Sequence, residues 1–204
     1  MTEDEARGWI CEHFGVPRET LLARFVDIVI AESGRQNLIS AATLPQIWRR
    51  HIVDSAQLLQ RVPAIDGDWF DIGTGAGFPG MVVAILSNGP VTLIEPRRKR
   101  ADFLRACVVE LDLGTRVTVH TARAEQIKGH AAVISARAVA ALPELLAATV
   151  HLSTKKTRWV LPKGKSAREE VASAQATWHG VFHVEQSITD PESLIILAEK
   201  VARR

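Results

Sequence analysis

Residues 69–80, WFDIGTGAGFPG, place a short apolar run directly before a turn that holds four glycines. Glycine lets the backbone adopt positive φ angles and lets another group approach the chain closely. The next six residues, MVVAIL, are apolar and predict a helix that follows the turn. A strand, a glycine turn and a helix in this order are typical of a parallel α/β sheet, in which ligands bind beyond the carboxyl ends of the strands.

The chain after this turn alternates short apolar runs with helical stretches. Strands are predicted at 91–95, 116–120, 131–135 and 158–162. Pro96 opens a predicted helix that reaches Asp112. This alternation predicts a mostly parallel sheet with helices on both faces. The runs 179–186 and 192–200 are separated only by the short segment SITDP, and they predict a C-terminal antiparallel hairpin.

The first sixty residues have a helical pattern instead. Helices are expected over about 2–14, 17–33 and 43–62. A length of 204 residues suits one domain. We therefore expect a single domain, in which residues 1–63 form a helical extension and residues 64–204 form a Rossmann-like core.

The residues around the glycine turn bear on which ligand it binds. The sequence GAGFPG, from Gly75, is a G-x-G-x-x-G, which dinucleotide sites and S-adenosylmethionine sites share, so it decides nothing alone. In both, an acidic residue that ends the second strand, here Glu95, takes the ribose hydroxyls. A carboxylate at the turn repels a pyrophosphate but attracts the ammonium and sulfonium of S-adenosylmethionine. Asp71, together with Gly73, Gly75 and Glu95, therefore predicts S-adenosylmethionine as the cofactor.

Charge is unevenly distributed along a chain whose net charge is only +2. Residues 35–61 contain four arginines against one aspartate, and residues 95–105 contain five basic side chains against two acidic ones. A third basic cluster spans 155–165. For any single cluster a solvated helix face is the more common explanation, but three clusters favour a polyanionic partner.

Several features together predict a cytoplasmic protein. Cys11 and Cys107 form neither a C-x-x-C pair nor a disulfide framework. The acidic start, MTEDEARGW, lacks the apolar segment of a signal peptide. The most apolar stretch, 131–150, is interrupted by charged residues and a proline, which argues against a membrane span. No spacing of His, Cys and Asp resembles a metal site.

Five motifs, in order along the chain, resemble one bacterial family. They are RHIVDS (50–55), DIGTGAGFPG (71–80), RAE (123–125), SARAVA (135–140) and PKG (162–164). This combination is similar to the RsmG family (glucose-inhibited division protein B), whose members methylate the N7 of a guanine in 16S ribosomal RNA. The resemblance implies a class I S-adenosylmethionine-dependent methyltransferase fold. It also implies 16S ribosomal RNA or the small ribosomal subunit as partner, with no membrane and no metal, and a monomer is the default expectation.

The resemblance also implies roles for individual residues. On the cofactor side these are Gly73 and Phe78 in the turn, Ala124 and Glu125 after the third strand, and Arg137 just past the fourth. At the mouth of the site or on the RNA side they are Arg50, His51, Asp54, Ser55, Arg123 and Lys163. Arg137, between methyl donor and base, and Lys163 are the predicted catalytic residues. Lys163 lies at the end of a strand, and this position favours a clamp on RNA phosphate beside the cofactor over a solvated loop.

The residue types themselves also support predictions for Arg137, for His51 and for two tryptophans. The planar guanidinium of Arg137, at the ligand edge of the sheet, suits a guanine edge or a phosphate, whereas an arginine after a strand commonly pairs with a surface carboxylate. We predict that Arg137→Ala impairs methyl transfer and largely spares the fold. His51 is expected to be a structural histidine that bonds to Asp54 one turn later. Trp48 and Trp69 lie in apolar patterns and are expected in the core.

The predicted reaction needs little acid or base chemistry. Guanine N7 keeps a free lone pair at neutral pH, so that positioning alone can remove roughly 7–11 kcal/mol of the barrier.

Three alternatives remain open. The first is a class I methyltransferase of a different substrate. The second is an NAD-dependent oxidoreductase, which Asp71 and the absence of tyrosine disfavour. The third is a non-enzymatic RNA-binding protein on the same fold.

Overall fold

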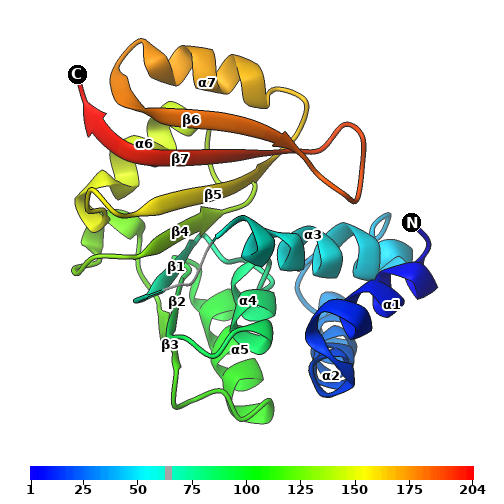
Figure 1. Cartoon of the computed structure of the whole chain (residues 1–204). Coiled ribbons are helices and arrows are strands. Elements are labelled where there is room, and N and C mark those ends of the chain that lie inside the picture. Colours follow the sequence, from blue (N-terminus) through cyan, green and yellow to red (C-terminus); the bar gives the residue numbers. More distant parts are fainter. Residues whose placement is uncertain (63–65) are drawn as a thin grey trace.

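The computed structural model of this chain describes residues 1–62 and 66–204. Figure 1 shows a single twisted sheet with helices on both of its faces, and the N-terminal helices on one side of it. The predicted boundary between residues 63 and 64 lies outside the described residues.

One mixed sheet organises the molecule. Its strands are β1 (Trp69–Ile72), β2 (Val91–Ile94), β3 (Val117–His120), β4 (Val133–Ala136), β5 (Arg158–Lys163), β6 (Trp178–Gln186) and β7 (Leu194–Arg203). Their spatial order is β3-β2-β1-β4-β5-β7-β6. Strands β1 to β5 are parallel, and β7 runs antiparallel to both β5 and β6. The predicted parallel sheet with a C-terminal antiparallel hairpin is confirmed, and the strand order reverses between β1 and β4, where ligands of such sheets bind.

Alternating side chains of each strand enter two separate cores. In β1, Trp69 packs in the core on one face of the sheet, while Phe70 and Ile72 pack in the core on the other. In β5, Val160 packs in the same core as Trp69, and Trp159 packs in the same core as Phe70. Both faces of a parallel sheet are buried, so its strands are apolar throughout rather than half polar.

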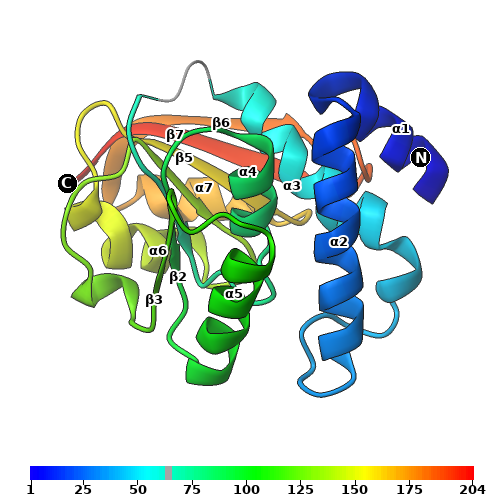
Figure 2. The same cartoon turned by 90° about the horizontal axis from the view of Figure 1, so that it is seen from below.

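The helices form a layer on each face, as Figures 1 and 2 show. On one face lie α4 (Gly80–Leu86) and α5 (Arg98–Glu110), with α1 (Glu3–Phe14) and α2 (Val16–Ser33) outside α4. On the other face lie α6 (Leu142–Thr149) and α7 (Ala167–Gln175). The start of α1 is the capping box expected from the sequence, with Glu5 N donating to Thr2 Oγ1. The sequence patterns did not single out α6 or α7.

The third predicted helix is instead four short turns of different geometry. They are η1 (Leu44–Gln46), a π-helical turn η2 (Trp48–Val53), α3 (Asp54–Ala56) and η3 (Gln57–Arg61). The Glu3 carboxylate on α1 accepts hydrogen bonds from Trp48 N at 2.9 Å and Arg49 N at 3.0 Å, so a distant residue caps the start of η2. π-Helical turns often occur at functional sites. This one presents Arg50 and His51 to a cavity, and Asp54 at the start of α3 lines the same cavity.

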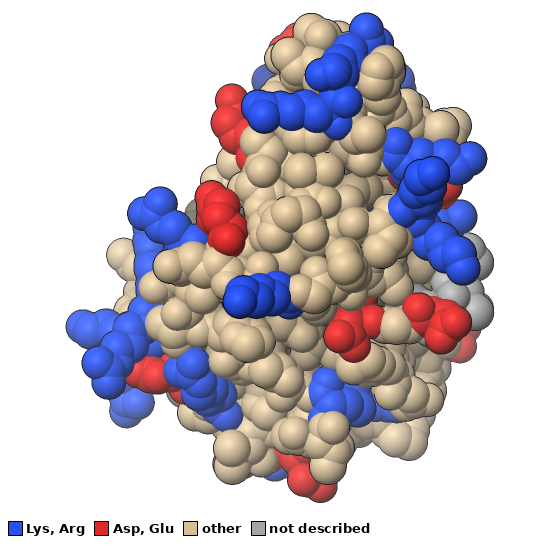
Figure 3. All heavy atoms as spheres, turned by 90° about the vertical axis from the view of Figure 1, so that its left-hand side faces the viewer, with Lys and Arg blue, Asp and Glu red and all other residues tan. Residues whose placement is uncertain are grey.

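Charged side chains are spread over the surface. On the face shown in Figure 3, Lys and Arg side chains stand in separate groups with uncharged surface between them. Within residues 1–62 and 66–204, no helix combines the length and the apolar character needed to cross a membrane.

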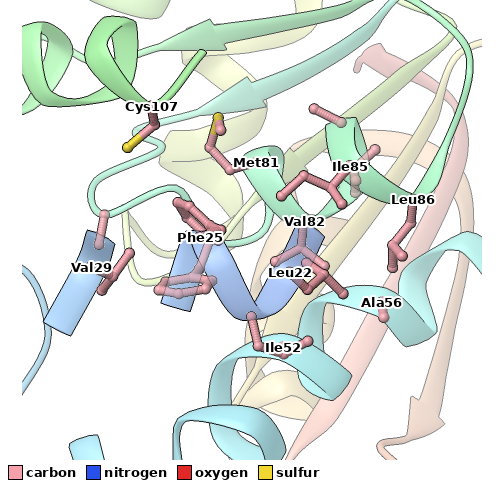
Figure 4. Packing of buried hydrophobic residues seen from close by; sticks show 14 of the residues in the cluster. Leu22, Phe25, Val29, Ile52, Ala56, Met81, Val82, Ile85, Leu86 and Cys107 are labelled. Atoms are coloured by element: carbon pink, nitrogen blue, oxygen red, sulfur yellow. The ribbon is translucent and has the colours of Figure 1, made fainter. Parts of the chain in front are cut away.

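The N-terminal helices share one core with the α4 face of the sheet. Figure 4 shows Leu22 and Phe25 of α2 beside Met81 and Val82 of α4, with Ile52 of η2 next to them. All five side chains are completely inaccessible to solvent. Trp48 and Trp69 are also buried, which confirms that prediction. This packing fixes α2 and η2 against the glycine turn that follows β1.

Candidate active site

The glycine turn, residues 73–79, lies between the ends of β1 and β2. Gly73 N donates to Ile94 O at 2.7 Å. The φ angle of Gly73 is +63°, and a Cβ there would lie 2.6 Å from Val139 Cγ2. The backbone conformation therefore strains any side chain at residue 73, and Val139 would have to move to admit one. The sequence explained the glycines of this turn by a ligand that comes close to the backbone. At Gly73, a side chain of this chain, Val139, also comes close.

The carboxylate of Asp71 faces the interior. It is wholly buried, with Oδ1 accepting from Ser135 Oγ at 2.6 Å and Oδ2 accepting from Gly80 N at 2.9 Å. A Cβ on Gly80 would lie 2.6 Å from Oδ2, so a glycine is needed there. Burial raises the pKa of Asp71 to about 6, against the opposing effect of these hydrogen bonds. The sequence predicted a carboxylate that attracts the ligand, whereas here Asp71 caps the N-terminus of α4, where the helix dipole favours it.

Glu95 joins the glycine turn to the loop after β2. It is almost completely buried, with Oε2 accepting from Gly75 N at 2.9 Å and Oε1 accepting from Arg97 N at 2.8 Å. A carboxylate oxygen can accept more than one hydrogen bond, so these contacts are compatible with the predicted ribose contact. The structure therefore brings Glu95, Gly73 and Gly75 together at one edge of the sheet.

A smaller cavity of about 260 Å³ lies beyond the ends of β1 and β2. Ile72 and Ile94 give it apolar walls. Of the predicted cofactor residues, Gly73, Ala124 and Glu125 line it. Arg123, which was predicted on the RNA side, also lines this cavity. An apolar slot with a carboxylate at its rim suits a purine ring and its ribose.

A larger cavity of about 730 Å³ lies beside the smaller one. Its lining includes Arg50, His51, Asp54, Arg137 and Lys163, all of which were predicted as site residues. They come from η2, α3, the end of β4 and the end of β5. Residues more than a hundred positions apart in the chain therefore converge on one cavity.

Arg137 occupies the centre of this group. Its two terminal nitrogens donate to Arg50 O at 3.2 Å and to His51 Nδ1 at 2.8 Å, and Nη1 lies 3.7 Å from Asp54 Oδ2. The guanidinium also lies 5.3 Å from the centre of the Phe78 ring. Burial lowers the pKa of Arg137, while Asp54 and Asp71 oppose that shift. Its side chain keeps 21% exposure and has N–H groups left to donate into the cavity.

His51 is neutral and takes part in two hydrogen bonds. Burial and the nearby Arg137 and Arg50 lower its pKa to about 3. Because Nδ1 accepts from Arg137, the proton lies on Nε2, which donates to Thr43 Oγ1 at 3.0 Å. The ring also stacks on Phe78, with 4.9 Å between ring centres. The expected bond to Asp54 is wrong, since the side chains of His51 and Asp54 instead contact Arg137 from two sides.

Asp54 links the larger cavity to the loop between β6 and β7. Its Oδ1 accepts from Thr189 Oγ1 at 3.0 Å, Gln57 Nε2 at 3.1 Å and Ser187 Oγ at 3.3 Å. Ser55, predicted at the mouth of the site, is instead 1% exposed and donates back to His51 O at 2.6 Å. Its role is therefore to support the helical turn.

Lys163 does not extend toward solvent. Its Nζ donates to Ala140 O and to Glu170 Oε2, both at 2.7 Å, and the side chain is 10% exposed. Lys163 therefore holds the segment after β4. Two of its three N–H groups are used in this way, so one is left to donate, and the phosphate clamp stays a prediction.

Each cation that lines the larger cavity is paired with a carboxylate. Arg50 pairs with Asp190, Arg137 with Asp54, and Lys163 with Glu170. The paired charges cancel, so the cavity suits a polar uncharged group better than a phosphate. This balance was invisible in the sequence, because each acid lies on a different element from its partner.

Several lining residues were missed from the sequence. They are Thr43, Val139, Ala140, Glu170, Thr189 and Ser193. The motif SARAVA contained a signal for Val139 and Ala140, since it places both directly after Arg137. Glu170 had no such signal, because its helix, α7, was not identified. Within residues 1–62 and 66–204, no group of three or more His, Cys, Asp or Glu side chains is arranged to hold a metal ion.

Comparison with known structures identifies the fold. The chain is similar to the glycopeptide N-methyltransferase MtfA complexed with S-adenosyl-L-methionine, at a TM-score of 0.61 and 10% identity over 73% of this chain and 93% of that one. It is also similar to a SAM-dependent methyltransferase from Aquifex aeolicus, at a TM-score of 0.61 and 15% identity over 76% and 93% of the two chains. The sheet is therefore that of the class I methyltransferases.

Sequence comparison is more specific. The model of a family described as rRNA small subunit methyltransferase G matches residues 18–192. A ribosomal RNA small subunit methyltransferase G from Novosphingobium aromaticivorans is 47% identical, over 99% of this chain and 90% of its own length. One from Sphingopyxis alaskensis is 49% identical, over 96% and 85%. With its glycine turn, paired cavities and fold, the chain belongs to the rRNA small subunit methyltransferase G family.

Proposed function

We propose that this protein transfers a methyl group from S-adenosylmethionine to the N7 of a guanine in 16S ribosomal RNA. Membership of the methyltransferase G family carries this conclusion. The paired cavities support it, because one suits a nucleoside and the other an uncharged polar base. The remaining alternatives, a different methyl acceptor, an NAD-dependent oxidoreductase and a non-enzymatic RNA-binding protein, are not favoured by these comparisons.

The residues of the smaller cavity fit S-adenosylmethionine. Ile94 and Ala124 offer apolar contact to the adenine, and Glu125 lines the cavity as an acceptor for the base edge. Glu95 is not part of the lining but directly follows Ile94, and its carboxylate, which accepts from Gly75 N and Arg97 N, can accept a further hydrogen bond from the ribose. Gly73 presents its backbone to the same cavity. When bound there, the cofactor supplies a methyl group activated by the adjacent sulfonium. Asp71 contributes by fixing the turn and α4, because its carboxylate makes no contact with the cavity.

The larger cavity would receive the target base. Arg137 has N–H groups that can donate to the guanine O6, which an adenine does not offer. His51, neutral and already bonded through both ring nitrogens, serves to orient Arg137 and does not take a proton. None is needed, because N7 reacts through a free lone pair. The residues of the site therefore act by position and by exclusion of water.

Contacts to RNA phosphates would come from outside the cavity. Arg97, Arg98 and Lys99 are exposed at the start of α5, and Arg123 is exposed at the rim of the smaller cavity. Basic residues at a helix N-terminus are unfavourable beside the dipole unless an anion binds there. Figure 3 shows basic side chains in separate groups, which suits a folded RNA that touches the protein at several points.

Three expectations about the whole molecule belong with this proposal. Residues 1–204 act as one unit, with the N-terminal helices as an extension of the Rossmann-like core, and the shared packing of α2 against α4 supports this. The protein works as a monomer without a metal. It acts in the cytoplasm, where ribosomal subunits are assembled.

The test is transfer of labelled methyl from S-adenosylmethionine to ribosomal RNA from cells that lack this gene. The RNA is offered both deproteinised and as small subunits, and RNA from cells that keep the gene is the control. We expect label on a guanine N7, and the form that accepts it identifies the natural substrate. Confirmed cofactor binding with no label on either form would refute the RNA assignment.

A further inference from the structure

We propose that Glu170 is a positioning residue that sets the wall between the cofactor cavity and the base cavity. The wall is the segment 138–141, directly after Arg137. This role rests on the proposed function, because one of its tests measures methyl transfer to RNA. The other test measures the affinity for S-adenosylmethionine and does not depend on any RNA.

The wall segment separates the two cavities. Val139 and Ala140 line both of them. Val139 also packs on Gly73, within 2.6 Å of the position that a Cβ would take there. A shift of this segment therefore changes the cofactor side and the base side together.

The backbone of the wall segment is secured at its end, where Ala141 O accepts from Leu145 N at 3.0 Å, but not before that point in the described residues. Ala138 has a φ of +56°, a left-handed conformation that costs a residue with a Cβ roughly 1–2 kcal/mol. In the described part of the chain, no backbone amide donates to Ala140 O, which accepts from Lys163 Nζ instead. Side chains from elsewhere must hold such a segment in place.

Glu170 supplies this restraint at two points. Its Oε2 accepts from Leu142 N at 2.9 Å, directly after the wall, and from Lys163 Nζ at 2.7 Å. Its Oε1 accepts from Ser166 Oγ at 3.1 Å. Lys163 in turn donates to Ala140 O at 2.7 Å. One carboxylate on α7 thus holds Leu142, directly after the wall, and through Lys163 it also holds Ala140 within the wall.

The wall position matters because methyl transfer needs the donor and N7 at contact distance. A displacement of about 1 Å in such a site can reduce the rate by roughly a hundredfold. Loss of the Glu170 carboxylate frees Leu142 N and Lys163 together, so the wall loses its restraint while the sheet and both cores are left intact.

The experiment compares Glu170→Ala, Glu170→Gln and the wild type, with Glu169→Ala as control. Glu169 is the exposed neighbour on α7, and its side chain makes no hydrogen bond or ion pair with the described residues. The measurements are kcat and KM for RNA, the dissociation constant of S-adenosylmethionine by calorimetry, and Tm.

We expect Glu170→Ala to lower kcat by roughly tenfold to a hundredfold with little change in KM for RNA. The dissociation constant of S-adenosylmethionine should rise about threefold to tenfold, as for the loss of one or two hydrogen bonds. Glu170→Gln keeps an acceptor for Leu142 N and should recover part of kcat. Glu169→Ala should match the wild type.

Unchanged kcat and unchanged cofactor affinity in Glu170→Ala would overturn the proposal. So would a loss of kcat that only follows a lower Tm and that Glu170→Gln does not relieve, because that marks a structural role. If the wild type itself fails to methylate RNA, the proposed function fails. The role of Glu170 is then tested by cofactor affinity alone, and an unchanged dissociation constant in Glu170→Ala would overturn it. Should Glu170→Ala not fold, Glu170→Gln is measured against the wild type in the same way.

Discussion

The buried Asp71 carboxylate should make the stability of this protein depend on pH. Burial raises its pKa from the ordinary 3.8 to about 6. A pKa that is higher in the folded state than in the unfolded state stabilises the fold fully below the unfolded value. That contribution is lost as the pH rises through the folded value. Asp71→Asn, which cannot ionise, should remove this dependence.

The size of the effect follows from the two pKa values. Between pH 4.5 and pH 7 the contribution of Asp71 to the free energy of unfolding falls by about 2 kcal/mol. The wild type should therefore lose about 2 kcal/mol relative to Asp71→Asn over that interval. In the variant, the amide NH2 must face either the Ser135 hydroxyl or Gly80 N, both of which donate to the carboxylate now. A buried donor left without a partner costs about 1–3 kcal/mol at every pH.

The assay is urea unfolding of both proteins at the two pH values, followed by tryptophan fluorescence. Asp27→Asn, at an exposed position on α2, controls for the loss of one negative charge. If the free energy of unfolding changes equally with pH in the wild type and in Asp71→Asn, burial does not raise the pKa of Asp71.

Cofactor affinity separates the two roles considered for Asp71. A direct bond from a carboxylate to the cofactor ammonium is worth about 1.5–3 kcal/mol, so its loss would weaken binding by roughly tenfold or more. A residue that only caps α4 should change the dissociation constant by less than about tenfold. If Asp71→Asn weakens cofactor binding by more than about tenfold and the pH dependence of stability stays as in the wild type, Asp71 contacts the cofactor directly, as the sequence predicted.

Three further predictions concern other parts of the site. Gly73→Ala should lower stability by about 1–2 kcal/mol and weaken cofactor binding, measured by urea unfolding and calorimetry, since its φ is positive and Val139 fills the space. Arg137→Ala should abolish most methyl transfer, and wild-type turnover would contradict its assignment. Because Arg137 joins η2 to β4, the variant should also lose about 1–3 kcal/mol of stability, more than the sequence alone predicted. Burial raises the pKa of Cys107 to about 12, so a thiol reagent at neutral pH should label the partly exposed Cys11 first, and mass spectrometry should show it.

Much of the fold was determined locally by the sequence. The strands β1 to β5 follow from short apolar runs, and the glycine turn follows from spacing that other residue types cannot replace. The hairpin of β6 and β7 follows from two alternating runs joined by a short polar segment. Each depends on neighbours within a few residues, which is the range over which propensity and periodicity act.

The irregular region after α2 depended on tertiary contacts. Residues 43–62 have a helical pattern, but the free amides of Trp48 and Arg49 are capped by Glu3, some forty-five positions earlier. The π-helical turn that begins at Trp48 directs Arg50 and His51 toward the larger cavity. No local pattern contains that information.

The motifs selected residues that do gather at the site, but not what their side chains do there. Asp71 was expected to face a ligand, and it turns into the interior because Ser135 and Gly80 donate to it. Lys163 was expected to clamp an RNA phosphate, and in the structure it is bonded to Glu170 and to the wall. In each case a partner on another element decides the direction of a charged side chain. Residue types and local order are therefore determined by the sequence itself, whereas the pairing of charges across elements is settled only when the chain folds and buries them together.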